Sequence, residues 1–398
     1  MNKENIARDT FQGYVRPNGK VGSRNLVAVI PSVICATDVA QAICRAVQGT
    51  VGFFHHQGCC QLPLDLKRVT DTLISLGCSP NVGAALVVSL GCEGTDVERL
   101  VQQIAATGKP VEVIRIQELG GMSRAIQKGT DLAQKLVMEI SGLQRQTVDI
   151  SNVVMGIKCG GSDTTSGMAS NCVIGSVADK LVDMGATVVF GETTEFLGGE
   201  HILARRAVGG ENGPVGQKIY EIVRRMEERA KAVGEDMRGG QPTPGNIKGG
   251  LSSIEEKSLG AIVKSGHRPI QGVLEYPQMV TTEKGLWIKD APGREPEILT
   301  GMAATGAQFL MFSTGRGAPQ GFPSMPVMKI CGNPNTYARM PYDMDLNAGQ
   351  IITGERSIEE MGEEAYALAL QVLNGRMTKN EAIHYTSTMD IYCLGPVI

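Results

Sequence analysis

Short apolar runs recur along the chain, each followed by a polar, glycine-containing turn and then by a segment with helical periodicity. Continuous apolar runs of this length are typical of strands that are buried on both faces of a parallel sheet. In the first part of the chain we predict strands at 26–31, 50–54, 84–90 and 111–116, and helices at 36–47, 65–76, 96–106 and up to about 140. This repeated strand–turn–helix order is typical of the α/β class with a doubly wound sheet.

A polar stretch, 144–151, interrupts the alternation, which then resumes. The later strands are predicted at 153–157, 187–190, 270–274, 308–312 and 327–330, and the later helices at 171–184, 216–233, 253–265 and 358–373. We therefore predict two doubly wound parallel-sheet α/β domains, residues 1–145 and 146–398, with a sub-boundary near 240–250. The active site is expected between them at the carboxyl ends of the strands, where such sheets bind ligands.

Three segments are not expected to join these sheets. Residues 1–12 have the composition of a mobile tail, and residues 13–25 of a small hairpin that turns on Asn18-Gly19. The glycine- and proline-rich stretch 239–250 is expected to be a functional loop without regular structure.

Composition narrows the classes of function. The chain has 398 residues, a net charge of -3, 42% hydrophobic and 20% charged residues, so it has neither the basic surface of a nucleic-acid-binding protein nor a membrane-length apolar run. It contains 50 glycines, a content that suits tight turns and close approach of the backbone to ligands. Ten cysteines without a Cys-x-x-Cys pair or a secretory signal predict free thiols and a cytoplasmic location.

Cys59, Cys92 and Cys159 each lie in a polar turn after a predicted strand. If these turns converge, the thiolates could hold a [4Fe–4S] cluster with one open iron, or contribute with His and Glu to a single Fe²⁺ site. The alternative is three buried, inert thiols beside glycine turns. Cys60 is expected to point away from Cys59, because successive side chains of an extended chain alternate.

His55 and His56 cannot both face one site for the same reason, so one is a candidate ligand or general base and the other a buried core histidine. Arg316 lies between two glycines, where its guanidinium could bind a ligand carboxylate or form a structural salt bridge. Lys257, and Arg24 beside Asn25, are weaker candidates that also fit a solvated surface.

Several of these motifs together resemble the altronate/galactarate dehydratase family over nearly the whole chain. The matching segments are Gly13–Arg16, Gly22–Asn25, His56–Cys59 with Gln61, Gly83–Glu93, Cys159–Asp163 with Ser166-Gly167, Glu192-Thr193, Pro244–Asn246 with Gly249-Gly250, Glu256–Gly260, Ser313–Gly317, and Asp345 with Gly349. The resemblance implies a lyase that eliminates water from a sugar acid or a related 2-hydroxy acid, such as altronate or galactarate. It also implies iron as the cofactor, with Mn²⁺ or Mg²⁺ as the alternative.

The chemistry of the side chains suggests roles for individual residues in such a reaction. Metal ligands would be Cys59, Cys92 and Cys159, and the candidates for moving the proton are His55, His56, Glu93 and Lys257. The candidates for binding substrate are Arg24, Asn25, Ser162, Asp163, Asn246 and Arg316. In the loop after Asn246 the chain has Ile247-Lys248, which places its basic residue one position away from the usual family pattern.

Single-chain members of this family carry a small N-terminal SAF domain that this sequence lacks. The resemblance is therefore to a large subunit that has a small SAF-domain subunit as its partner, within an oligomer. This organisation is also similar to that of (2R)-sulfolactate sulfo-lyase, which releases sulfite instead of water. A third alternative is a binding subunit without catalytic activity.

Overall fold

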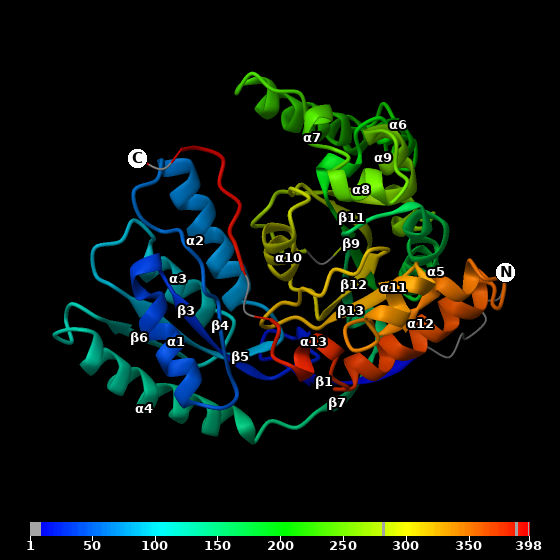
Figure 1. Ribbon diagram of the computed structural model, residues 1–398. Helices are drawn as coiled ribbons and strands as arrows, with labels where there is room; N and C mark the ends of the chain where they lie inside the picture. The colour runs from blue at the N-terminus through cyan, green and yellow to red at the C-terminus, as the bar shows by residue number, and fades with distance from the viewer. Residues whose placement is uncertain (1–8, 281–282, 387–388, 397) are drawn as a thin grey trace.

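Two parallel sheets, of four and seven strands, lie at the centre of the computed structural model (Figure 1). The structure describes residues 9–280, 283–386, 389–396 and 398. The four-stranded sheet has the order β4-β3-β5-β6. Its strands are β3 (Leu26–Pro31), β4 (Thr50–Gly52), β5 (Val82–Ser89) and β6 (Val111–Arg115). The predicted α/β class is confirmed.

Helices cover both faces of this sheet, which explains why its strands are apolar throughout. The helices are α1 (Thr37–Ala46), α2 (Pro63–Gly77), α3 (Val97–Ala105) and α4 (Met122–Ser141). Along β3, Val27 and Val29 pack with α1 and α4, whereas Ala28 and Ile30 pack with α2 and α3. Alternate residues of a strand therefore serve two different cores.

The seven-stranded sheet has the order β10-β11-β9-β8-β12-β13-β14, and all its strands are parallel. They are β8 (Val154–Cys159), β9 (Thr187–Phe190), β10 (Ile270–Leu274), β11 (Gly285–Lys289), β12 (Phe309–Thr314), β13 (Val327–Cys331) and β14 (Leu346–Asn347). The strands β11 and β14 were not predicted. β11 lies between β10 and β9, so a sheet built only from the predicted strands would lack the strand that connects β10 to the others.

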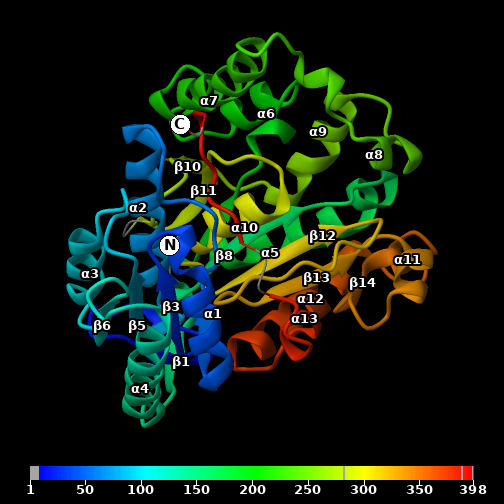
Figure 2. The ribbon, with the colours of Figure 1, turned by 60° about the vertical axis from the view of Figure 1, so that its left-hand side comes forward.

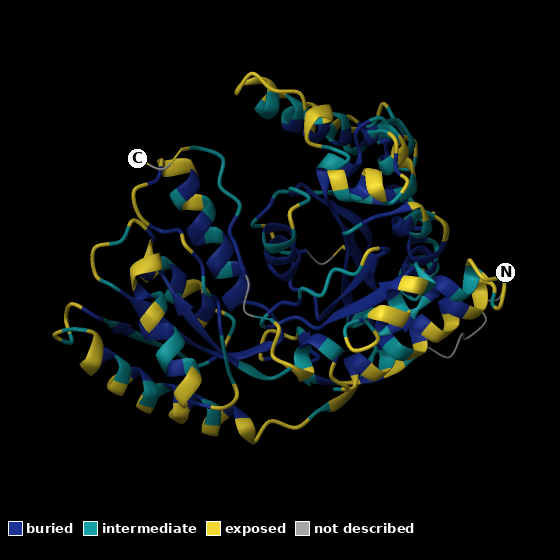
Figure 3. Cartoon of the chain, viewed as in Figure 1, coloured by how far each residue is buried: buried dark blue, intermediate teal, exposed yellow. Residues whose placement is uncertain are grey.

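One hydrophobic core connects the two sheets. The helices α5 (Asn171–Asp183) and α12 (Ile358–Leu373) pack on one face of the larger sheet. On the other face, Ile298 and Met302 of α10 (Glu295–Ala303) share a core with Val69 and Leu73 of α2. Figure 3 shows the buried strands at the centre of both sheets and the exposed outer faces of the helices. The division into domains at 145/146 stays a prediction.

The hairpin predicted at 13–25 is confirmed, and strands also form in two segments where none was predicted. The strand β1 (Thr10–Val15) lies between β2 (Val21–Gly22) and β7 (Gln146–Asp149) in a small antiparallel sheet. The expected tail is therefore wrong for residues 10–12, and the polar stretch at 144–151 contains a strand. Buried and exposed positions alternate along Thr10–Tyr14, so β1 does not read as a continuous apolar run. Residues 1–8 lie outside the described residues.

The remaining helices are short or lie outside the sheets. They are α6 (Glu200–Arg205), α7 (Pro214–Lys231), α8 (Pro244–Lys248), α9 (Ile254–Ile262), α11 (Pro334–Arg339) and α13 (Lys379–Ala382). Helices α6 to α9 lie together beyond one end of the larger sheet (Figure 2). The expected irregular loop 239–250 thus contains α8, whose first turn is capped by Thr243. No helix of the described chain combines the length and hydropathy that a membrane span requires.

Candidate functional site

A cavity of about 580 Å³ lies at the carboxyl ends of β8, β9, β11 and β12. Its lining comes entirely from residues between 158 and 316. The cavity therefore lies at the predicted edge of a parallel sheet, but within the seven-stranded part of the chain and not between the two sheets. The lining residues are Lys158, Cys159, Gly160, Gly161, Ser162, Thr194, Glu195, Gln241, Thr243, Gly245, Asn246, Lys257, Gly293, Arg294, Glu295 and Arg316.

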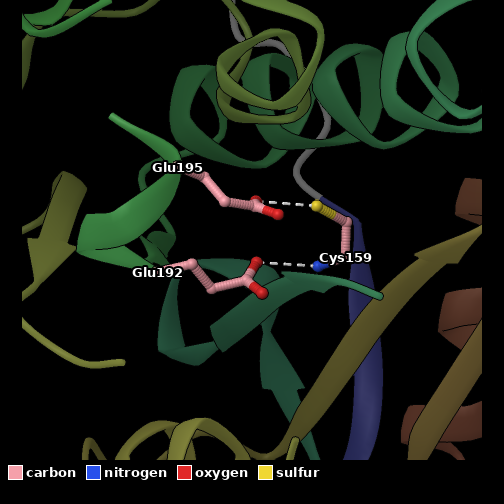
Figure 4. Close-up of side chains that lie close together, drawn as sticks. All are labelled: Cys159, Glu192 and Glu195. Atoms are coloured by element: carbon pink, nitrogen blue, oxygen red, sulfur yellow. Dashed lines mark hydrogen bonds between the residues drawn. The ribbon is translucent and has the colours of Figure 1, made fainter. Parts of the chain in front are cut away.

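Cys159 and two glutamates meet at the inner wall of this cavity (Figure 4). The Cys159 thiol donates to Glu195 Oε2 at 2.9 Å, and the Cys159 backbone N–H donates to Glu192 Oε2 at 2.9 Å. Cys159 ends β8, and both glutamates follow the neighbouring strand β9. Glu192 has φ 71°, a left-handed conformation that is uncommon for a residue other than glycine and that concentrates at functional sites.

A buried lysine occupies the centre of this group. Lys264 Nζ lies 3.0 Å from Cys159 Sγ, 2.6 Å from Glu192 Oε2 and 2.7 Å from Glu195 Oε2. A second buried lysine, Lys158, lies 3.2 Å from the other Glu192 oxygen. Two ammonium groups therefore balance two carboxylates without solvent, which is the condition for keeping charges inside a protein.

The surroundings set the protonation of each group. Burial and the two glutamates raise the pKa of the Cys159 thiol, so the thiol keeps its proton at neutral pH. Burial alone would raise the pKa of Glu195, but Lys264 and Lys257 lower it to about 2. Burial and the charge of Glu195 raise the pKa of Glu192, which makes it the carboxylate that takes up a proton more readily.

This Cys/Glu/Glu group could hold a metal ion, since sulfur and carboxylate oxygen are ligands for Fe²⁺ and Zn²⁺. The three ligand atoms lie within 4.8 Å of one another. However, the Lys264 ammonium hydrogen-bonds to the same three atoms, so an ion bound by all three would have to displace it. The Cys159 sulfur and the two carboxylates are therefore suitable metal ligands, but the Lys264 ammonium group occupies the space between them.

Lys257 faces the cavity from α9. Its Nζ donates to Gln241 Oε1 at 2.7 Å and lies 3.4 Å from Glu195 Oε1. Only 11% of the side chain is exposed, so it is not a solvated surface lysine. Of the four residues predicted to move the proton, Lys257 is the one that lines the cavity.

Four other predicted residues lie on or beside the same wall. Ser162, Asn246 and Arg316 line the cavity, and Asn246 Nδ2 donates to the Ser162 carbonyl at 2.9 Å. The Arg316 backbone N–H donates to Gly161 O at 2.9 Å. This hydrogen bond fixes the turn from which Arg316 lines the cavity. Asp163 does not line this cavity; it accepts from Thr165 Oγ1 at 2.6 Å and Asn333 Nδ2 at 3.0 Å, contacts that hold the turn together.

The predicted histidines and the other two thiols lie at the edge of the four-stranded sheet instead. Cys59 and Cys92 are exposed, and in the described residues the one group of three or more metal-binding side chains within 4.8 Å contains neither of them. Both ring nitrogens of His55 contact backbone, Pro31 O at 2.8 Å and Gln57 N at 3.1 Å. Burial lowers the pKa of His55 to about 4, so it has the character of an uncharged core histidine.

Glu93 and His56 also have partners away from the cavity. Glu93 accepts from Ser32 Oγ and from the Gly91 N–H at 2.6 Å, and His56 Nδ1 lies 2.9 Å from Asp390 Oδ1. The structure therefore does not assemble the predicted three-thiol centre with a histidine or Glu93 beside it. A role for these side chains in metal binding or proton transfer stays a prediction.

Arg24 and Asn25 precede β3, so they lie at the amino end of the sheet, opposite the edge where ligands bind. Arg24 pairs with Glu381 at 2.9 Å, and Asn25 donates to Ile140 O at 2.8 Å. These contacts tie distant segments together, and no contact at the cavity supports their predicted role in substrate binding.

Several residues of the cavity wall and of the buried cluster behind it were not among the predicted site residues, namely Lys158, Glu195, Arg294 and Glu295 in the wall and Glu192 and Lys264 behind it. Lys264 ends an otherwise apolar segment, Ala261-Ile262-Val263, and this lysine on a buried face is a signal that could have found it. The Gly160 backbone also marks the site, since a Cβ there would lie 2.5 Å from Glu295 Oε1.

A charged cavity at the ends of parallel strands places this chain among the α/β proteins with a small-ligand site. Comparisons with known proteins identify the family. Residues 150–394 match the model of the D-galactarate/altronate dehydratase C-terminal domain. Residues 13–141 match that of the second domain of D-galactarate dehydratase/altronate hydrolase. The chain belongs to this family, as the sequence motifs predicted.

Particular relatives fall into two groups. The chain is 39% identical to the (2R)-sulfolactate sulfo-lyase subunit beta of Chromohalobacter salexigens, over 94% of this chain and 95% of that protein. It is 33% identical to the galactarate dehydratase (L-threo-forming) of Escherichia coli and 30% identical to the altronate dehydratase of Bacillus subtilis. These two alignments cover 92% and 94% of this chain, and 73% and 75% of the relatives. All three names are those of lyases, so the general class of enzyme is supported.

Proposed function

We propose that this chain is the large subunit of a lyase that removes the C2 proton of a 2-hydroxy acid and expels a leaving group from C3. The observation that carries the proposal is the cavity, where Lys257, Arg294 and Arg316 face a space that is bordered by the balanced cluster of Lys158, Lys264, Glu192 and Glu195. A carboxylate substrate and an enediolate intermediate are both anionic, so cations at the wall favour them.

Lys257 is proposed to move the C2 proton, with Glu195 as its carboxylate partner at 3.4 Å. Arg316 would bind the substrate carboxylate, because its guanidinium offers paired donors on a glycine-flanked turn. Burial of Cys159, Glu192 and Lys264 behind this wall keeps water from the inner side of the site.

Iron is the cofactor that the sequence predicts. When bound, a divalent metal would supply a Lewis acid for the substrate oxygens. Cys159, Glu192 and Glu195 have the donor atoms to hold it, once Lys264 moves away from them.

Two leaving groups are candidates. Sulfite is favoured by the (2R)-sulfolactate sulfo-lyase subunit beta, which aligns over 95% of its own length. Its identity to this chain, 39%, is higher than the 33% and 30% of the two dehydratases. Water, the leaving group predicted from the sequence, is favoured by the names of the dehydratase relatives and by a cavity lined by many hydrogen-bonding side chains. The name of the sulfo-lyase relative, a subunit beta, supports an enzyme of more than one subunit. The partner that we propose is a small SAF-domain chain, and the location that we propose is the cytoplasm.

An anaerobic assay of the chain purified from its host with any bound partner tests these proposals. Formation of a 2-keto acid together with equimolar sulfite from 3-sulfolactate supports a carbon–sulfur lyase. A 2-keto acid from altronate or galactarate without sulfite supports a hydro-lyase. If the complex with intact metal content turns over no 2-hydroxy acid, the chain is a binding subunit and the proposed function is wrong.

A further inference from the structure

The four exposed cysteines of the chain gather at one edge of the molecule. Among the ten cysteines, Cys35, Cys59, Cys60 and Cys92 are exposed, and all the others are buried or partly buried. They lie on the three turns that follow β3, β4 and β5, at the carboxyl edge of the four-stranded sheet. We call these four residues the thiol edge.

Hydrogen bonds join the three turns to one another. The Ile34 N–H donates to Gln57 O at 3.0 Å, and the Gly94 N–H donates to Gly58 O at 2.9 Å. The turn that carries Cys59 and Cys60 is held further by Gln61, whose Oε1 accepts from the Gly58 N–H at 2.8 Å. Gly58 has φ 105°, and a Cβ there would lie 2.5 Å from Ser32 O, so this turn fits only glycine.

Within the thiol edge, the adjacent residues Cys59 and Cys60 form a close pair. Their sulfur atoms are 3.7 Å apart, contrary to the expectation that they point in opposite directions. The reason is the backbone of Cys60, which has φ 51° and therefore is not extended, so the alternation of side chains is broken. The turn thus presents two thiols side by side to solvent.

We propose that Cys59 and Cys60 are a vicinal dithiol that hydroperoxides oxidise reversibly to a disulfide between neighbouring residues. One sulfur attacks the peroxide oxygen to give a sulfenic acid, and the first water leaves. The second thiol attacks the sulfenic sulfur, the S–S bond forms, and its proton leaves with the hydroxyl as a second water. The pair loses two electrons and two protons, and one hydrogen peroxide becomes two waters.

The geometry favours the pair over the single exposed thiols. The second step is intramolecular for Cys59 and Cys60, whereas within the described chain no other sulfur is in hydrogen-bond contact with Cys35 or Cys92. Neighbouring Cα atoms are about 3.8 Å apart, which is shorter than the usual Cα separation across a disulfide, and such strained bonds are more easily reduced. The product would therefore be a reversible modification and not a structural link.

The test treats the reduced, metal-free chain with one equivalent of hydrogen peroxide, alkylates the remaining thiols and maps the peptides by mass spectrometry. We expect the peptide with Cys59 and Cys60 to be unalkylated and lighter by two hydrogen atoms, and dithiothreitol to restore it. Its oxidised fraction should exceed that of the Cys35 and Cys92 peptides by about tenfold, because the second step is intramolecular.

The variant Cys60→Ser removes the resolving thiol and should leave a sulfenic acid on Cys59 that dimedone traps. Cys35→Ser and Cys92→Ser are the matched controls, since each removes an exposed thiol but leaves the pair. Phenylarsine oxide, a probe for paired thiols, should bind the wild type and both controls but bind Cys60→Ser at least about tenfold more weakly. Equal alkylation of all four exposed thiols after peroxide, or a link from Cys59 to Cys92, would overturn the proposal.

Discussion

The two parallel sheets present very different chemistry at the same topological position. At the carboxyl edge of the seven-stranded sheet, Cys159 is buried with two glutamates and Lys264 beside a cavity. At the carboxyl edge of the four-stranded sheet, the cysteines are exposed, and Cys59 contacts Cys60. Topology therefore predicts where functional side chains collect, but burial and charge balance decide what each edge can do.

This contrast separates proton chemistry from thiol chemistry. The buried Cys159 thiol donates a hydrogen bond to Glu195 and is shielded from solvent, whereas the exposed pair of thiols can meet oxidants. We assign the proposed elimination to the edge of the larger sheet and the redox modification to the smaller one. The following predictions test that division, in decreasing order of expected effect.

Replacement of Lys257 by Met should lower kcat about a thousandfold, because a positioned acid–base group contributes on this order. Exchange of the C2 hydrogen with deuterium from solvent should be lost with it. Lys218→Met, a change at a more exposed lysine of α7, is the control and should leave both rates unchanged. Full C2 exchange in Lys257→Met would show that another group moves the proton.

Replacement of Lys264 by Met should lower the free energy of unfolding by about 3–5 kcal/mol, because it removes the buried cation that the two carboxylates share. It should also open the Cys/Glu/Glu group to a metal. We expect Co²⁺ to restore much of the stability and to give a thiolate-to-cobalt absorption band that Cys159→Ser abolishes. The surface pair Lys180–Glu363 supplies the control, Lys180→Met, with an effect below about 1 kcal/mol. Equal Co²⁺ affinity through Cys159 in the wild type and in Lys264→Met would show that Lys264 does not compete with a metal for these ligands.

Acid should weaken the cluster through Glu195. Its pKa is lowered to about 2 in the folded chain, so its contribution is present above the unfolded value of about 4.5 and is lost as the pH falls through 2. A difference of this size corresponds to about 3 kcal/mol. Urea unfolding at several pH values should show that the free energy of unfolding falls less steeply below pH 4.5 in Glu195→Gln than in the wild type. Glu192 has a raised pKa, so its contribution to the free energy of unfolding changes with pH in the opposite direction. If the pH dependence of unfolding is the same in Glu195→Gln as in the wild type, the acid sensitivity arises from another group.

The larger part of the fold could be predicted because parallel strands buried on both faces are apolar throughout, as in Val82–Ser89. Gln146–Asp149 could not, since its residues are exposed or half-buried and all but one of them are polar. At the site, Cys159 and Lys257 were predictable from glycine turns and charged motifs. The apolar segment before Lys264 could have marked this lysine as buried, but not its partners. Glu192 and Glu195 lie 72 and 69 positions away, and spacing along the chain gives no indication of such pairing.

Arg316 tests whether the cavity recognises a carboxylate. Arg316→Gln should raise KM about tenfold to a hundredfold, because hydrogen bonds to charged groups contribute about 1.5–3 kcal/mol. Arg316→Lys should recover only part of this, since one ammonium cannot form paired hydrogen bonds. The exposed Arg339→Gln is the control and should leave KM unchanged. If Arg316→Gln changes kcat and not KM, the guanidinium acts on the transition state instead of on substrate binding.

His56 gives the smallest expected effect and the most direct comparison of the two edges. It lies 2.9 Å from Asp390, which also pairs with the cavity residue Arg294 at 2.9 Å, so one chain of contacts joins the edges. The His56 side chain is 55% exposed, and ion pairs this exposed contribute about 1 kcal/mol or less. His56→Gln should therefore change KM by at most about fivefold, through a loosened Arg294, and leave kcat unchanged. A thousandfold loss of kcat in this variant would instead place the catalytic edge on the four-stranded sheet, because only direct proton transfer or metal binding by His56 could produce it.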